Sequence, residues 1–367
     1  MNKIIYLDAA ASSLKPESVI DAEMDFLRHN YANAGRGVCA RAAAVDEMVA
    51  NARRRVAQFI GAQPNQIVFT SGTTDAFNRI VNIIKTARGN GSDFCVAVSD
   101  LEHHSARLPF QVGACNIAIC PLDSEYNYDV SNIPVADVIV VTAMSNVMGT
   151  AQNVAGVIAA ARAKNPNVIS VVDAAQYVVH DKIDVNEWGC DFLCFSAHKI
   201  GADTGLGVMY IKNPDDWPAD KFGGGMVARV NGLDEFTTQP APEKFEAGTL
   251  PLTQIAGLKP AIDYLESNRP DLNLIKYIYD ELIKNPRIRI LTARDAAILT
   301  FVVRDMHALD FGAFAGARGL CVRVGNMCAS WIHRALGIDG SVRISVGPWN
   351  TIDDARAAVD IINAVVK

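Results

Sequence analysis

One lysine stands where several polar residues follow an apolar run. Lys199 comes after the run 192–195, together with Ser196 and His198, and the glycine-bearing turn GADTGLG lies directly behind it. In a partly dry pocket the ammonium form of a lysine is disfavoured, and the free amine can condense with an aldehyde. A surface lysine that opens a loop is an equally good interpretation of this segment taken alone.

A second apolar run, in VISVVDAAQ, ends at Asp173, and Gln176 follows shortly after. An aspartate in such a place can keep a pyridine nitrogen protonated, which makes a cofactor ring an electron sink. The alternative is an N-cap for the next segment, a common use of Asp after a strand. For this residue alone, the cap is the favoured interpretation.

The segment IVFTSGTTDAFNRI places a Gly-Thr-Thr turn between a predicted strand and an amphipathic helix. Backbone N–H groups and the helix dipole attract anions at such a start, so a phosphate would bind near Thr73 and Thr74. Capping by either threonine uses the same helix terminus and is compatible with phosphate binding.

Two adjacent histidines, His103 and His104, follow another apolar run. A flat imidazole at this end of a sheet could stack over a cofactor ring or exchange protons near neutral pH. Paired histidines could also bind a metal, but no carboxylate or cysteine ligand lies at a recognisable spacing. We therefore predict no metal site.

These residues need a scaffold, and the hydrophobic pattern predicts an α/β fold. Near-continuous apolar runs such as VIVV and VISVV suit a mostly parallel central sheet with helices on both faces and functional residues at the strand ends. The predicted strands are residues 66–70, 94–99, 116–122, 138–145, 168–173, 191–196 and 207–212. The predicted helices are residues 45–60, 74–86, 154–164 and 252–265.

A second pattern begins at about Tyr277 and predicts a smaller C-terminal α+β domain. Its predicted strands are residues 297–303, 321–324 and 341–346, and its predicted helices are residues 310–317 and 353–366. We assign residues 15–260 to a large cofactor-binding domain, and residues 1–14 and 261–367 to the small domain. The Gly/Pro-rich stretch 223–242 is too irregular for a helix or a strand and is predicted to be a functional loop or an interface arm.

The composition favours a compact globular protein with small-molecule partners. Half of the 367 residues are hydrophobic, and the 34 basic and 40 acidic residues form no long run of either sign. We therefore expect no nucleic-acid partner and no membrane partner. No apolar stretch is long enough to span a bilayer, and the start MNKIIYLDAAASS lacks the pattern of a secretory signal, which predicts a cytoplasmic protein.

The eight cysteines are scattered, without CxxC pairs or Cys/His clusters at zinc spacing. We expect reduced thiols, most of them buried as small hydrophobic side chains. They are Cys39, Cys95, Cys115, Cys120, Cys190, Cys194, Cys321 and Cys328.

Taken in order, seven segments resemble the class V aminotransferase superfamily of fold-type I enzymes, which depend on pyridoxal 5'-phosphate (PLP). They are SGTTDAFN, DLEHHSARLPFQ, SNVMGT, VVDAAQ, FSAHK, FEAGT and VRVGNMCA, and they extend over nearly the whole chain. The strongest resemblance is to group II cysteine desulfurases and selenocysteine lyases, which remove sulfur or selenium from an amino acid and leave alanine. The resemblance implies a PLP-dependent transferase fold, an amino-acid substrate and a sulfur-acceptor protein as a further partner.

The resemblance also implies roles for single residues around the cofactor. Lys199 matches the lysine that forms a Schiff base with PLP, and Asp173 matches the partner of the pyridine nitrogen. Gln176 matches the hydrogen-bond partner of the cofactor's phenolic oxygen, and His103 matches the stacking and catalytic histidine. The phosphate ligands are matched by Thr74, Ser196 and His198, beside Thr73. Thr249 matches a phosphate contact that is donated across a dimer. The last match implies a homodimer.

Three further residues are predicted to contact the substrate. Asn146 matches an asparagine on the substrate side of the cofactor, and Arg343, in SVRIS, matches the arginine that holds the substrate carboxylate. A guanidinium binds a carboxylate in two places, although an ordinary surface arginine on a late strand is the alternative. Arg323 is the third predicted substrate contact.

Cys328, in CVRVGNMCASW, is the residue on which the specific reaction depends. The resemblance places it at the nucleophilic cysteine that attacks the substrate sulfur and becomes a persulfide. The glycine before it predicts a mobile loop, and an exposed thiol near a cofactor can act as a nucleophile, whereas a buried one would be inert. Without the resemblance, an inert cysteine is the favoured interpretation, since the chain has seven others.

Two alternatives accompany this hypothesis. Where the family often carries histidine, this chain has Gly35 and Asn326, and Met327 stands at a frequently polar position. A class V transaminase, epimerase or kynureninase-like lyase with Cys328 as a bystander would fit these residues. A non-catalytic scaffold with the same fold is the other alternative, and the intact Lys199 and Asp173 argue against it.

Overall fold

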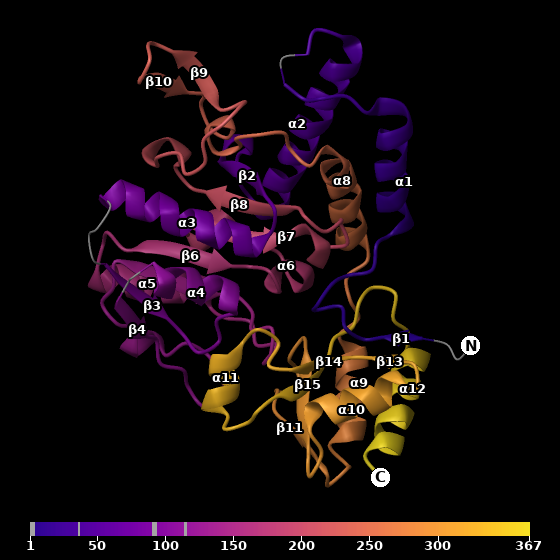
Figure 1. The fold of residues 1–367 in the computed structure, drawn as a ribbon. Helices are drawn as coiled ribbons and strands as arrows, with labels where there is room; N and C mark the ends of the chain where they lie inside the picture. Colours follow the sequence, from indigo (N-terminus) through magenta and orange to yellow (C-terminus); the bar gives the residue numbers. More distant parts are fainter. Residues whose placement is uncertain (1–3, 36, 90–93, 114–115) are drawn as a thin grey trace.

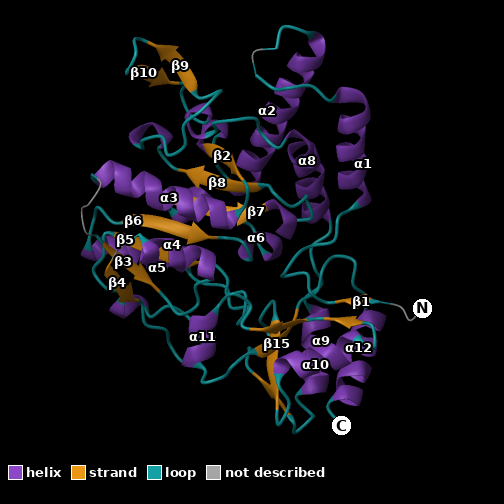
Figure 2. Cartoon of the chain, viewed as in Figure 1, coloured by secondary structure: helices purple, strands orange, loops and turns teal. Residues whose placement is uncertain are grey.

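The computed structural model describes residues 4–35, 37–89, 94–113 and 116–367. The chain forms a large α/β part with a seven-stranded sheet and a smaller part built from the C-terminal third (Figure 1; Figure 2). In the described part of the chain, no helix has both the length and the apolar character needed to cross a membrane.

The large sheet has the strand order β2-β8-β7-β6-β5-β3-β4. Its strands are β2 (Ile67–Thr70), β3 (Cys95–Val98), β4 (Asn116–Ile119), β5 (Val138–Thr142), β6 (Ile169–Asp173), β7 (Phe192–Ser196) and β8 (Gly207–Ile211). Only β8 runs antiparallel to its two neighbours; the five strands from β7 to β4 are parallel. All residues of β5, β7 and β8 are buried, as expected for strands covered on both faces, and the predicted mostly parallel sheet is confirmed.

Helices cover both faces of this sheet (Figure 1). On one face, α3 (Thr73–Arg88) and α4 (His104–Val112) pack onto the strands through Phe77, Ile80 and Phe110. The other face is covered by α2 (Ala40–Ile60), α5 (Val154–Lys164), α8 (Leu252–Ser267) and the short α7 (Val185–Trp188). The sequence did not predict α4 or α1 (Glu17–Asp25): α4 contains Pro109, and α1 has a single buried residue, Val19, so its apolar pattern is weak.

The smaller part has a four-stranded antiparallel sheet in the order β11-β12-β15-β14. Its elements are β11 (Ile288–Ile290), β12 (Leu299–Val303), β14 (Arg323–Gly325), β15 (Ser341–Ile344), α9 (Asn273–Leu282), α10 (Ala308–Gly316) and α12 (Ile352–Val365). Helix α11 (Ser330–Ala335) comes from the same stretch of chain but packs on the core of the large part through Ile332. The N-terminal segment joins it: β1 (Ile5–Tyr6) pairs with β13 (Leu320–Cys321), and Ile5 and Leu7 belong to its hydrophobic core. The division into domains at residues 1–14, 15–260 and 261–367 remains our proposal.

The prediction for the stretch 223–242 was wrong in one respect. It contains two short strands, β9 (Val227–Val230) and β10 (Phe236–Thr238), which pair as an antiparallel hairpin that extends away from the large sheet (Figure 1). Valine and threonine favour extended backbone, and the turn between the strands is closed by a 2.9 Å hydrogen bond from the N–H of Asn231 to the carbonyl of Glu235. The glycines and prolines around these two short strands made the stretch look irregular in the sequence.

Candidate active site

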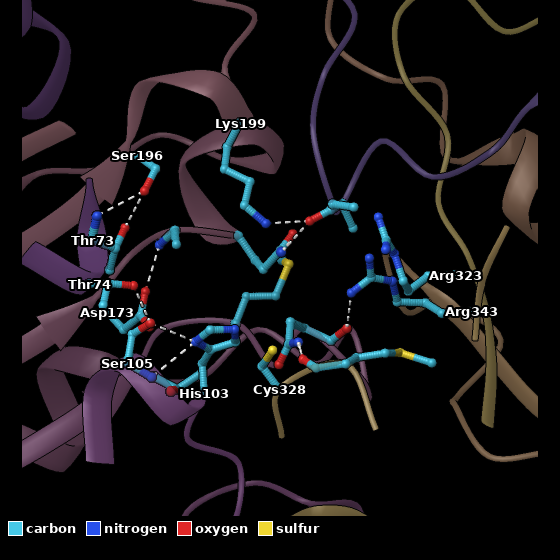
Figure 3. A pocket seen from close by; sticks show the side chains of 18 of the residues that line it. Thr73, Thr74, His103, Ser105, Asp173, Ser196, Lys199, Arg323, Cys328 and Arg343 are labelled. Carbon is cyan, nitrogen blue, oxygen red and sulfur yellow. Dashed lines mark hydrogen bonds between the residues drawn. The ribbon is translucent and has the colours of Figure 1, made fainter. Parts of the chain in front are cut away.

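A cavity of about 470 Å³ lies at the carboxyl ends of the parallel strands. Thr142, Asp173 and Ser196 end strands β5, β6 and β7 and all line it, as expected for an α/β sheet. Figure 3 shows its polar side chains in two groups, with Thr73, Thr74, Asp173 and Ser196 on the left and Arg323 and Arg343 on the right; Lys199 and Cys328 lie between. The first group belongs to the large part and the arginines to the small part.

Lys199 lies in a short 3₁₀ turn, Ala197–Lys199, directly after β7. Its Nζ donates a hydrogen bond to the carbonyl oxygen of Ala10, and the Nε2 of Gln176 donates to the same oxygen at 2.8 Å. Burial, followed by the nearby charge of Arg343, lowers the pKa of Lys199 from 10.5 to about 7. A substantial fraction of the side chain is therefore a free amine at neutral pH.

Asp173 is buried at the end of β6, where its Oδ1 accepts the N–H of Ala175 at 2.9 Å. Burial raises its pKa to about 6, while that hydrogen bond and the charge of Lys199 oppose the rise. The carboxylate is therefore mainly ionised at pH 7, and a cationic ring nitrogen beside it would stabilise it further.

A cradle for an anion lies at the start of α3. Ser196 Oγ accepts the N–H of Thr73 at 2.8 Å and shares a second hydrogen bond of 2.8 Å with Thr73 Oγ1. Gly72, at φ 145°, precedes the helix, and a Cβ at Gly207 would lie only 2.5 Å from the Gly72 Cα. Only glycine permits this close approach, which aims the helix N-terminus into the cavity.

His103 caps α4, since its Nδ1 accepts the N–H of Ser105 at 3.1 Å. Burial, with a contribution from the charge of Lys199, lowers the pKa of His103 to about 4, so the ring is neutral at pH 7. Ser105 also bonds Thr74 at 2.6 Å between the two hydroxyl oxygens. Ser105 was not among the predicted site residues, although its position directly after two histidines could have indicated it.

Glu102 is a second residue that sequence reasoning missed. It is fully buried behind the cavity, where Oε1 accepts the hydroxyls of Ser99 at 3.0 Å and Tyr128 at 2.6 Å, and Oε2 accepts the hydroxyl of Thr142. Burial raises its pKa to about 7. Because Thr142 is paired with Asp173 between β5 and β6, this cluster supports the strand ends that line the cavity.

Two arginines form the opposite side of the cavity. Arg343 is 3% exposed; its Nη2 lies 3.1 Å from Asp8 Oδ1, and its Nη1 donates to the Asn146 carbonyl at 3.0 Å. Arg323 contacts the other oxygen of Asp8 at 2.7 Å. One carboxylate between two guanidinium groups leaves a net positive charge that suits an anionic group of a substrate. Asp8 was not predicted, although an acid directly after the apolar IIYL is a recognisable signal.

Asn146 joins the two parts of the chain. Its Nδ2 donates to the carbonyl of Met327 at 2.8 Å, while its buried Oδ1 has no hydrogen-bond partner among the described residues. His198 also lines the cavity, and its Nδ1 lies 3.3 Å from the hydroxyl of Ser12.

Cys328 is exposed and lines the same cavity. Cys115 lies outside the described residues; of the seven cysteines described, Cys39 and Cys328 are exposed and only Cys120, Cys190 and Cys194 are buried. The expectation that most cysteines are buried was therefore wrong for the described part. Burial raises the pKa of the three buried thiols far above its ordinary value, which makes them poor nucleophiles.

Of the predicted site residues, only Thr249 lies outside this cavity. It is exposed and lines a second cavity of about 590 Å³, together with Gly35, Asp46, Arg53 and Glu246. Among the described residues, no group of three or more His, Cys, Asp and Glu side chains is arranged to hold a metal ion.

A family model described as aminotransferase class-V matches residues 5–357. The chain is 33% identical over 375 residues to a cysteine desulfurase of Cronobacter sakazakii, a match that covers 97% of this chain and 92% of the relative. A probable cysteine desulfurase of Pseudomonas putida is 32% identical over 379 residues, with 98% and 92% covered.

Two solved structures have the same fold. The cysteine desulfurase CsdA from Escherichia coli has a TM-score of 0.90 at 30% identity, and the match covers 99% of this chain and 94% of that one. A cysteine desulfurase from Thermococcus onnurineus has a TM-score of 0.92 at 30% identity, with the same coverage. These structures confirm the predicted transferase fold. The chain therefore belongs to the class-V aminotransferase family, and the relatives described above are cysteine desulfurases.

Proposed function

We propose that this protein is a PLP-dependent cysteine desulfurase that removes sulfur from L-cysteine, or selenium from L-selenocysteine, and leaves alanine. One observation carries the proposal: a partly neutral amine, Lys199, and an exposed thiol, Cys328, line one cavity with the positively charged pair Arg323 and Arg343. An amine for the cofactor, a nucleophile for sulfur and a carboxylate site are the three requirements of this reaction. The names of the similar proteins agree with it.

The residues present fit PLP. The cradle at Thr73, Thr74, Ser196 and His198 offers hydrogen-bond donors to a phosphate, and the buried Oδ1 of Asn146 lacks a partner that a cofactor hydroxyl would supply. The neutral ring of His103 suits stacking, and Gln176 lies beside Lys199 at the Ala10 carbonyl. When bound, PLP supplies an electron sink for the electron pair left at the substrate α-carbon.

Side chains of this protein would hold the cofactor, transfer the proton and bind the substrate carboxylate. Lys199 would hold the cofactor and then take the α-proton of the substrate at Nζ, which its lowered pKa permits. Asp173 would keep a positive charge on the ring nitrogen, and Arg343, with Arg323, would bind the substrate carboxylate.

Cys328 would take the sulfur. Its thiolate attacks the substrate sulfur, an S–S bond forms as the C–S bond breaks, and the electron pair leaves with the carbon. The carbon gains the proton that the thiol gave up, so that L-cysteine and the enzyme thiol become L-alanine and an enzyme persulfide with no atom left over. Release of sulfide then needs a thiol reductant or a sulfur-acceptor protein.

We further propose a homodimer. Thr249 is too far from the cavity of its own chain to line it, and it borders a second cavity with an exposed rim. The β9–β10 hairpin nearby exposes Leu233 and Phe236, and apolar side chains gathered on such a surface favour an interface. A second copy of the chain would then place Thr249 at the phosphate.

The test uses the PLP-loaded protein with L-cysteine and dithiothreitol, and alanine and sulfide are measured together. We expect equal amounts of both products. Cys328→Ala should lower sulfide and alanine formation at least 100-fold, because no other described thiol lines the cavity. Cys39→Ala removes the other exposed thiol among the described cysteines and should leave the rate unchanged.

If Cys328→Ala retains the wild-type rate, the persulfide route is wrong. A PLP-loaded wild-type protein that forms no alanine would instead favour another class V reaction on a different amino acid.

A further inference from the structure

The loop that carries Cys328 is held in an unusual backbone conformation. Met327 and Cys328 both have positive φ angles, 50° and 54°, although neither is a glycine. Two consecutive residues of this kind are rare in proteins, and they persist only where the surroundings hold them. The glycine before Cys328 predicts a mobile loop, and contacts with the rest of the chain hold the conformation seen here.

Helix α4 supplies several of these contacts, in addition to the hydrogen bond from Asn146 Nδ2 to the Met327 carbonyl. The backbone N–H of His104 donates to the carbonyl of Cys328 at 2.7 Å. The Nε2 of the same histidine accepts the N–H of Ser330 at 3.2 Å and lies 3.1 Å from the Ser330 hydroxyl. One residue of the large part thus contacts the loop at the carbonyl of the nucleophile itself and again two residues further along the chain.

Trp331 also contacts α4. Its ring lies edge-on to the ring of His104, at 5.2 Å between centroids, and the guanidinium carbon of Arg107 lies 4.1 Å from its centroid. Arg107 belongs to α4 and is itself held by Asp100, at 3.2 Å. Figure 1 shows α11, which begins at Ser330, close to α4 although more than 200 residues separate them in the sequence.

We propose that His104 is a positioning residue for Cys328: through Ser330 and Trp331 it fixes the nucleophile's loop on α4, so that the thiol meets the substrate sulfur from a fixed backbone. The proposal rests on the proposed desulfurase function for its catalytic consequence. His104 has no role in the functional hypothesis above, and its neighbour His103 contacts the cavity instead.

The state of the ring agrees with this role. Nε2 can accept the N–H of Ser330 only when it carries no proton. Burial lowers the pKa of His104 below its ordinary value of 6.5, which favours the neutral ring at pH 7.

The experiment compares four proteins, each loaded with PLP. His104→Ala removes the acceptor and the ring; His104→Gln keeps an acceptor oxygen near the position of Nε2; wild type is the reference. His307→Ala is the matched control, because His307 Nδ1 also accepts a backbone N–H at a helix start, that of Leu309 at 3.2 Å, but in the small part of the chain. Alanine formed in a single turnover without reductant, the cofactor absorption spectrum, the KM for L-cysteine and amide hydrogen exchange of residues 326–335 are measured.

We expect His104→Ala to form alanine about 10–100-fold more slowly, since small displacements of a reacting group have effects of this size. Its spectrum should match that of the wild type and its KM should stay within about twofold, while exchange in residues 326–335 becomes faster. His104→Gln should recover most of the rate, and His307→Ala should behave as wild type.

A single-turnover rate for His104→Ala within twofold of that for His307→Ala overturns the proposal. A slower rate with an altered cofactor spectrum also overturns the proposal. A slower rate with unchanged hydrogen exchange in residues 326–335 does so too. In either case the effect would act through the cofactor or His103. If the wild-type protein itself forms no alanine, the proposed function fails, while the exchange comparison still decides whether His104 fixes the loop.

Discussion

At the scale of single residues, burial separates the titratable groups of the site into distinct states. Lys199 is pushed toward its neutral amine, and His103 is kept neutral, while Asp173 remains mainly ionised at pH 7. Environments that move pKa values apart in this way are typical of acid–base sites. Glu102 lies behind them, and burial raises its pKa to about 7. The pH dependence of stability that Glu102 causes therefore measures how strongly this region is desolvated.

Glu102→Gln should change how the free energy of unfolding depends on pH. The pKa of Glu102 rises from 4.5 to about 7 on folding, so the native state binds the proton more tightly than the unfolded state. Stability from this group is complete below pH 4.5 and is lost as pH rises to about 7, a change of roughly 3 kcal/mol. The glutamine variant lacks this loss. Urea unfolding of the cofactor-free proteins at several pH values measures the difference, and a difference that does not vary with pH contradicts the prediction.

At the scale of elements, the site depends on where strands end and helix α3 begins. Ser196 ends β7, and Gly207 starts β8 beside the Gly72 turn, so the backbone of three segments meets at the anion cradle. The geometry leaves no room for a side chain at Gly207, and this absence of a Cβ is itself a requirement of the site.

Gly207→Ala should damage both stability and cofactor binding. Its Cβ would lie 2.5 Å from a backbone atom of Gly72, which cannot move without shifting the start of α3. We expect a loss of roughly 1–3 kcal/mol in the free energy of unfolding and a weaker affinity for PLP by at least about tenfold. Gly316→Ala, where a Cβ meets nothing within 4 Å, is the control. Urea unfolding and PLP titration by absorbance give both values, and wild-type affinity in Gly207→Ala would show that the cradle does not hold the cofactor.

The same elements explain what the sequence could and could not predict. The strands of the large sheet were predictable because both faces are buried and their apolar runs are almost unbroken. Lys199, Asp173 and Ser196 follow such runs directly, so their approach at one sheet edge was also predictable. Asp8 was not, because it meets Arg343 across 335 residues of sequence, and no local pattern encodes such a contact. Glu102 is hidden for a similar reason, since its partners come from three separate segments.

At the scale of the whole molecule, one chain contains nearly all of the proposed site. The large part supplies the residues for the cofactor, the small part supplies Arg323, Cys328 and Arg343, and Asn146 connects the two through Met327. Thr249 is the exception. Because it lies beside the β9–β10 hairpin, we expect the active site to be complete only when a second chain binds there. A phosphate contact from a second chain would couple association to cofactor binding.

The pair of changes Leu233→Asp and Phe236→Asp should therefore affect both properties. Both side chains are exposed on the hairpin, and a buried carboxylate in an apolar interface is strongly unfavourable. We expect wild type to have twice the mass of one chain by light scattering, and the double variant to be monomeric, with PLP affinity reduced about tenfold, the loss of roughly one hydrogen bond. Leu309→Asp, which changes an equally apolar exposed residue on α10, should remain a dimer.

Thr249→Ala should weaken PLP binding in the wild-type dimer but have no effect in the double variant, because only a second chain can bring Thr249 to the phosphate. A monomeric wild type with full affinity, or an equal effect of Thr249→Ala in both backgrounds, would place the phosphate site within one chain.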